Sequence, residues 1–110
     1  MTEIWTGDDA QGEVYGWPEP NLALCIVKQD ERTTAVVEVR PTFSESDIAV
    51  LLRKRNLYNK CIKAQQGEAA PVATECLALV PALAVSARVR DAAQKAGVIL
   101  VSTAAAVPEA

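Results

Sequence analysis

The sequence of 110 residues contains no histidine, the side chain most often used as a general base near neutral pH. A Ser-His-Asp triad and a histidine proton shuttle are therefore excluded. Neither of the common glycine-rich phosphate-binding patterns, GxxxxGK and GxGxxG, occurs in the chain. Enzyme classes that depend on these groups are not expected here.

Cysteine is also scarce, with three widely spaced residues and no CxxC pair: Cys25, Cys61 and Cys76. A structural zinc site needs four ligands, usually Cys or His at short spacing, so this set does not favour one. We interpret them as small apolar core residues. An odd number of cysteines favours a reducing compartment, so we expect a cytoplasmic protein.

Long hydrophobic runs are missing as well. The longest, from Cys76 to Val85, covers about ten residues, whereas a transmembrane helix needs about twenty. Met1–Asp9 contains acids and lacks the basic and apolar regions of a secretory signal. We therefore expect no membrane segment.

Aromatic residues make up only 5% of the chain, so aliphatic side chains and alanine must fill the core. The length fits one domain over 1–110, with a core at about 12–102 and a frayed tail at 103–110.

The net charge of −3 argues against tight, non-specific binding to nucleic acid. An acidic segment at 1–31 and a basic segment at 44–66 are nevertheless separated along the chain.

The apolar pattern predicts five strands, at 12–17, 21–28, 33–40, 75–80 and 98–102. The run at 21–28 is almost continuously apolar, which predicts a strand buried on both faces. Ser44 and Asp47 resemble a capping box, and helical spacing continues from there to Gly67, so we expect a helix at 45–66. A second helix is expected at 86–96.

This order predicts an α/β fold of the mixed-sheet, α+β kind: an antiparallel three-strand meander, a helix, and a parallel strand–helix–strand unit. Within the meander, Glu38 and Arg40 stand two residues apart, so strand alternation places both on one face. A charged pair in an apolar strand needs compensation by metal, phosphate or mutual pairing. Asn21 begins the neighbouring strand directly after Pro20.

Pro20-Asn21 and Glu38-Val39-Arg40, followed by a polar-faced helix and the strand and helix at 77–97, resemble the PD-(D/E)xK nuclease superfamily over about residues 12–102. The resemblance implies a restriction-endonuclease-like core. It also implies that Glu38 binds Mg²⁺ or Mn²⁺, with Asn21 and Arg40 at the positions of the family's catalytic Asp and Lys. A divalent metal held there would activate the water that attacks a phosphodiester.

The sequence departs from the family at two of these positions. Asn21 lacks the carboxylate charge, and Arg40 cannot act as a base because a guanidinium stays protonated. The candidates for a migrated second carboxylate are Glu13, Glu19 and the Asp8-Asp9 pair. Three basic residues of the first helix either contact phosphates of DNA or RNA or form a solvated surface: Arg53, Lys60 and Lys63.

Three functions remain open at this stage. The first is a nuclease-like domain that is weakly active or non-catalytic and binds nucleic acid or a protein partner. The second is an active metal-dependent nuclease that uses Glu38 and a migrated carboxylate. The third is a homodimeric protein-interaction module with no nucleic-acid role, favoured by the acidic pI and by the aromatic residues Trp5, Tyr15 and Trp17.

Overall fold

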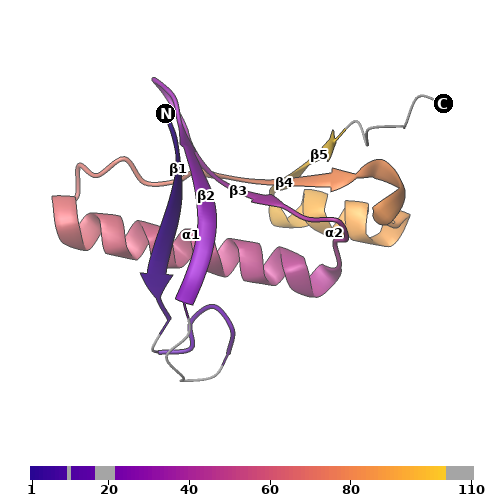
Figure 1. Ribbon diagram of the computed structural model, residues 1–110, viewed down its shortest axis with the longest axis horizontal. Helices are drawn as coiled ribbons and strands as arrows, with labels where there is room; N and C mark the ends of the chain where they lie inside the picture. The colour runs from indigo at the N-terminus through magenta and orange to yellow at the C-terminus, as the bar shows by residue number, and fades with distance from the viewer. Residues whose placement is uncertain (10, 17–21, 104–110) are drawn as a thin grey trace.

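The computed structural model describes residues 1–9, 11–16 and 22–103. Five strands form one sheet in the order β1-β2-β3-β4-β5 (Figure 1). Their bounds are Thr2–Asp8 for β1, Leu22–Gln29 for β2, Thr34–Val39 for β3, Glu75–Pro81 for β4 and Val98–Thr103 for β5. The two helices are α1 at Glu45–Gln66 and α2 at Ala87–Ala96, and a 3-10 turn, η1, at Ala82–Ala84 precedes α2.

The pairing directions confirm the expected mixed sheet. β1, β2 and β3 pair antiparallel, whereas β3, β4 and β5 pair parallel. The meander and the strand–helix–strand unit are therefore both present. No helix in the described part of the chain is long and apolar enough to cross a membrane. The restriction-endonuclease-like core remains a prediction.

The first strand lies earlier in the chain than alternation predicted. Residues 12–16, expected in a strand, form turns and bends instead. The buried Asp9 carboxylate accepts hydrogen bonds from the backbone N–H groups of Val14 and Tyr15, each at 3.1 Å, which closes a local loop. Thr2–Asp8 pairs with β2 along its whole length. The prediction of a strand at 12–17 was wrong, because Asp9 holds the backbone there in a loop.

The ends of both helices follow from local chemistry. Before α1, the Ser44 backbone N–H donates to the Asp47 carboxylate at 2.8 Å, as the capping-box pattern predicts. Before α2, the Ser86 hydroxyl accepts from the Val89 N–H at 3.2 Å. Gly97 ends α2 in the left-handed region at φ 82°, which favours glycine. Both predicted helices are confirmed.

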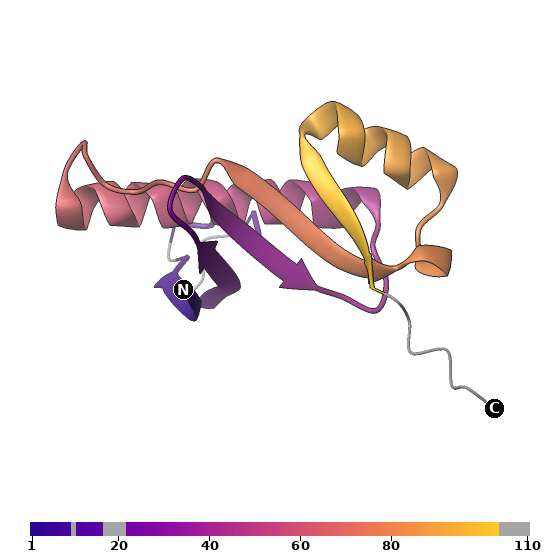
Figure 2. The same ribbon diagram turned by 90° about the horizontal axis from the view of Figure 1, so that it is seen from above.

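Both helices lie on the same side of the sheet; in Figure 1 they are below β3, β4 and β5, and β1 and β2 pass in front of α1. The connections β3–α1–β4 and β4–α2–β5 move across the sheet in one direction. Connections between parallel strands are almost always right-handed, so two connections that progress across the sheet in the same direction place their helices on the same face. In Figure 2, seen from above, β3 and β4 pass in front of α1. The opposite face carries no layer of secondary structure from the described residues.

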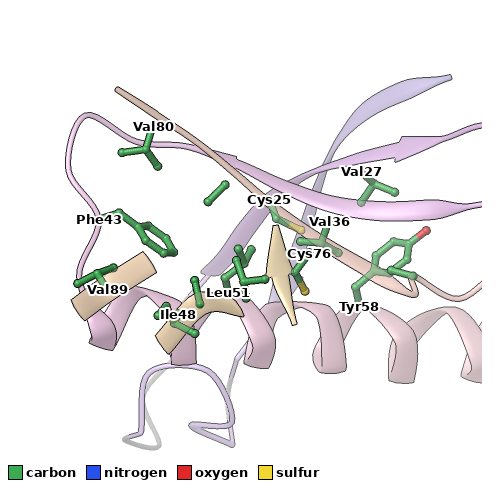
Figure 3. Packing of buried hydrophobic residues seen from close by; sticks show 14 residues of the cluster. Cys25, Val27, Val36, Phe43, Ile48, Leu51, Tyr58, Cys76, Val80 and Val89 are labelled. Carbon is green, nitrogen blue, oxygen red and sulfur yellow. The ribbon is translucent and has the colours of Figure 1, made fainter. Parts of the chain in front are cut away.

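The core fills the space between the helices and the covered face. Leu51 and Ile48 of α1 pack with Val36 of β3 and Cys76 of β4, and all four side chains are buried (Figure 3). Val89 of α2 belongs to the same cluster. Near the other end of α1, the rings of Trp5 and Tyr58 meet edge to face with centroids 5.3 Å apart.

One expectation about burial was wrong. The almost continuous apolar run of β2 predicted a strand covered on both faces. Cys25 and Val27 are buried against the core, but Leu24, on the other face of β2, is 49% exposed. The reason is the placement of both helices on one side, which leaves the apolar second face of the strand without a cover.

Candidate functional site

Glu38 lies in β3 with its side chain directed at α1, and it is buried among charged partners. Lys54 of α1 forms an ion pair with Glu38 through Oε1, and the two residues are each 7% exposed. The guanidinium of Arg40 lies 3.8 Å from Glu38 Oε2. Glu38 and Arg40 therefore share one face of the strand, and mutual pairing supplies part of the compensation that the buried carboxylate needs.

Arg40 extends this chain of charges to the first turn of α1. Its Nη2 lies 3.2 Å from Asp47 Oδ1, and its Nε donates to the Thr42 carbonyl at 3.4 Å. Glu38 Oε2 is buried and has no hydrogen-bond partner among the described residues. Two cations thus flank one carboxylate, an arrangement that repels a divalent metal ion and neutralises the charge that would hold it.

Two of the carboxylates proposed to complete a metal site are engaged elsewhere, Asp8 is exposed at the end of β1, and Glu19 lies outside the described residues. Asp9 accepts the loop hydrogen bonds at Val14 and Tyr15, and Glu13 pairs with Lys60 at 2.6 Å. Within residues 1–9, 11–16 and 22–103, no group of three or more His, Cys, Asp or Glu side chains is placed to hold a metal. Asn21, Glu19 and Trp17 lie outside the residues that the structure describes.

The basic residues of α1 are divided between the loop and solvent. Arg53 Nη1 donates to the Val14 carbonyl at 3.3 Å, and the Lys60 ammonium pairs with Glu13, which raises the Lys60 pKa. Lys63 is exposed near the end of the helix. Arg53 and Lys60 thus bind Val14 and Glu13 to α1, which reduces the positive charge they offer to a phosphate.

Lys54 is the site residue that sequence reasoning missed. It falls at a helical interval from the buried Leu51 and Tyr58, so its inward direction could have been read from the spacing of α1. A lysine inside an apolar stripe indicates a buried acid opposite it. Glu38 is the acid that the neighbouring strand provides.

A cavity of about 240 Å³ lies beside this cluster where the pairing of β2 and β3 ends, at Ile26↔Val37. Its walls come from both strands and from α1, and include Leu24, Val39, Glu38 and Lys54. Cys25 also lines it, and burial raises the pKa of this thiol to about 11. Such a thiol stays protonated near neutral pH and is a poor nucleophile.

A further apolar feature is the uncovered face of the sheet. One row of aliphatic side chains crosses all five strands through successive register partners: Ile4↔Ile26, Ile26↔Val37, Val37↔Leu77 and Leu77↔Ile99. Ile4 is 72% exposed and Ile99 is 47% exposed at the two ends of this row, Ile26 and Leu77 are half-buried, and Val37 at its centre is only 8% exposed. We call these five residues the central row.

A second apolar row lies two residues further along the strands. Val39, Leu79 and Val101 are register partners across β3, β4 and β5, and Leu24 of β2 lies toward the same end of the face. Val39 is 62% exposed. On the other side of the central row, Lys28, Ala35 and Glu75 form a charged margin. We call the two apolar rows and this margin the open face.

Sequence reasoning treated the apolar runs as evidence of burial without asking which partner would cover each side. Strands with aliphatic residues on both faces are typical of sheets covered by two layers. This chain supplies a layer for one face, within its described residues. A contiguous exposed apolar patch of this kind marks an interaction site more often than a scattered exposed leucine does.

Comparisons with known proteins identify no relative of this chain. No protein-family model matches the chain, no curated protein matches it, and no solved structure matches it.

Proposed function

We propose that this chain is a non-catalytic protein-association domain that forms a homodimer through its open face. The observation that carries the proposal is the central row, an unbroken line of aliphatic side chains across five strands on a face that no helix of the described chain covers. Withdrawing such a surface from water is the main driving force of protein association.

The charges around Glu38 favour association over nuclease chemistry. A PD-(D/E)xK site needs a carboxylate pair facing a metal ion, whereas Glu38 faces Lys54 and Arg40. Asp9 and Glu13 serve the loop that packs on α1. Glu38 is therefore better explained as one partner of an ion pair that joins β3 to α1 than as a metal ligand.

A second copy is the partner that best fits the open face. Two sheets stack face to face at about 10 Å with interdigitated side chains, and a copy brings a face of equal extent and equal apolarity. The charged margin carries one residue of each sign, Lys28 and Glu75, so the surface can match itself.

The size of the open face predicts moderate affinity. Between Cα positions, the open face measures roughly 20 Å across the five strands and roughly 13 Å along them, from the charged margin to Val39. With the surrounding side chains, this approaches the lower end of specific interfaces, about 600 Å² on each partner, and stays below the standard size of about 800 Å². We expect a dissociation constant in the micromolar range.

Sedimentation velocity over a range of protein concentrations tests the proposal. Wild-type protein should shift from monomer to dimer with concentration. Val39→Glu and Ile99→Glu should each weaken dimerisation by at least about tenfold, because each buries a carboxylate in an apolar interface. Both positions are exposed in the monomer, so the variants are expected to fold.

Leu83→Glu is the matched control. Leu83 is fully exposed in η1 and lies outside both apolar rows, so the same change of charge there should leave the dimer intact. A wild-type protein that stays monomeric at high concentration would refute the proposal. Equal weakening by all three variants would show that net charge, and not the open face, controls association.

A further inference from the structure

The charged margin of the open face carries one residue of each sign, placed symmetrically about β3. Lys28 on β2 pairs in register with Ala35 on β3, and Ala35 pairs in register with Glu75 on β4. The two charged residues therefore stand at one level along the strands, one strand to each side of β3. Their strand positions place their Cα atoms about 10 Å apart, with the small Ala35 side chain between them.

Both side chains point toward the open face. Their neighbours along the strands, Val27 and Cys76, are buried in the core on the opposite side, and alternation directs Lys28 and Glu75 away from it. Lys28 is exposed and Glu75 is half-buried. No ion pair joins either of them to another side chain in the described part of the chain.

We infer that the second copy docks about a two-fold axis that runs along β3, held in that orientation by two reciprocal ion pairs between Lys28 of each copy and Glu75 of the other. This inference rests on the proposed function. Rotation about an axis along β3 places β4 of one copy over β2 of the other. Because Lys28 and Glu75 share one level along the strands, the rotation brings Lys28 over Glu75 at two equivalent places.

The other in-plane axis, across the strands, gives a poorer match. It would reverse the strand direction of the copy and place Lys28 over Leu24, and Glu75 over Leu79. Each charge would then lie on an aliphatic side chain, which costs free energy without a compensating partner. The axis along β3 keeps aliphatic residues on aliphatic residues and opposite charges together, so it sets both orientation and register.

Mixing two single variants tests this arrangement. Lys28→Glu should dimerise poorly alone, because two glutamates then face each other at both places, and Glu75→Lys should fail likewise through two lysine pairs. An equimolar mixture should form a heterodimer with both pairs attractive. We expect each single variant to dimerise about tenfold more weakly than wild type, and the mixture to recover most of that loss.

The double variant Lys28→Glu/Glu75→Lys is the second measurement and should dimerise like wild type, since both reciprocal pairs are restored with reversed sign. Circular dichroism of each variant confirms that it is folded before mixing. If either single variant does not fold, the double variant alone decides, and its failure to dimerise overturns the inference.

The outcomes separate this inference from the proposed function. If Val39→Glu breaks the dimer while the charge variants behave like wild type, the open face is the interface and the two-fold axis along β3 is wrong. The same holds if the single variants dissociate and the mixture does not recover. If wild-type protein does not dimerise at all, the proposed function itself fails.

Discussion

Lys54 on α1 forms an ion pair with Glu38 on β3, and both side chains are buried between the helix and the sheet. The partners are separated by the end of β3, a loop and about two and a half turns of α1, yet the fold brings them together. The pair fixes where α1 crosses β3. It also leaves Glu38 paired, whereas the hypothesis of a metal-dependent nuclease requires Glu38 to be free to bind a metal ion.

Removing one partner of this pair should destabilise the protein strongly. Glu38→Ala leaves Lys54 buried without a counter-charge, a change that typically costs about 3–5 kcal/mol. Urea unfolding followed by circular dichroism measures the loss. The double variant Glu38→Leu/Lys54→Met should recover most of the stability, because it leaves no unpaired charge. A loss below about 1 kcal/mol for Glu38→Ala would contradict burial of the pair.

Mn²⁺ titration should distinguish whether Glu38 serves as an ion-pair partner of Lys54 or as a metal ligand. We expect no saturable heat when Mn²⁺ is titrated into wild-type protein, because Lys54 and Arg40 face the carboxylate of Glu38. Isothermal titration calorimetry makes the measurement, with Lys63→Glu as a control for non-specific surface binding. Stoichiometric binding that Glu38→Gln abolishes would return the nuclease hypothesis to first place.

The three cysteines should differ in reactivity. Burial raises the pKa of Cys25 to about 11 and also raises the pKa of Cys76. At pH 8 a thiol of pKa 11 is only about 0.1% thiolate. Iodoacetamide at pH 8 should therefore modify the half-buried Cys61 first, as read by intact-protein mass spectrometry, and the other two only after denaturant is added. Rapid modification of Cys25 in the native protein would show that its pocket opens.

Gly7 in β1 should resist substitution because a ring occupies the space beside it. A Cβ at this position would overlap the indole of Trp5, which packs on Tyr58. Gly7→Ala should displace Trp5 and cost roughly 1–3 kcal/mol, read as a lower thermal midpoint. In a Trp5→Leu background the same substitution should cost much less. An equal cost in both backgrounds would exclude the ring as the cause.

Much of the fold could be predicted from the sequence because its signals are local. The Ser44–Asp47 capping box and the glycines after each helix set the limits of α1 and α2. The apolar runs of β2 to β5 are dense enough to identify strands. β1 could not be predicted, since its apolar residues are few and its strand conformation depends on pairing with β2.

The candidate site was harder to predict because it depends on contacts distant in the sequence. Glu38 and Arg40 were expected on one face, and they lie there. Lys54 was not predicted to face them, although its helical spacing from the buried Leu51 and Tyr58 indicates that its side chain points inward. The open face could not be predicted at all, since an apolar strand looks the same whether its second face is covered by its own chain or by another.

The most direct test of the open face is a filtered nuclear Overhauser experiment on a mixture of ¹³C-labelled and unlabelled protein. It records contacts only between methyl groups of different molecules. We predict intermolecular contacts between Ile26 of one molecule and Leu77 of the other, which lie on either side of the proposed axis along β3. Intermolecular contacts confined to the outer edge of β1 or β5, or to the helices, would contradict dimerisation through the open face.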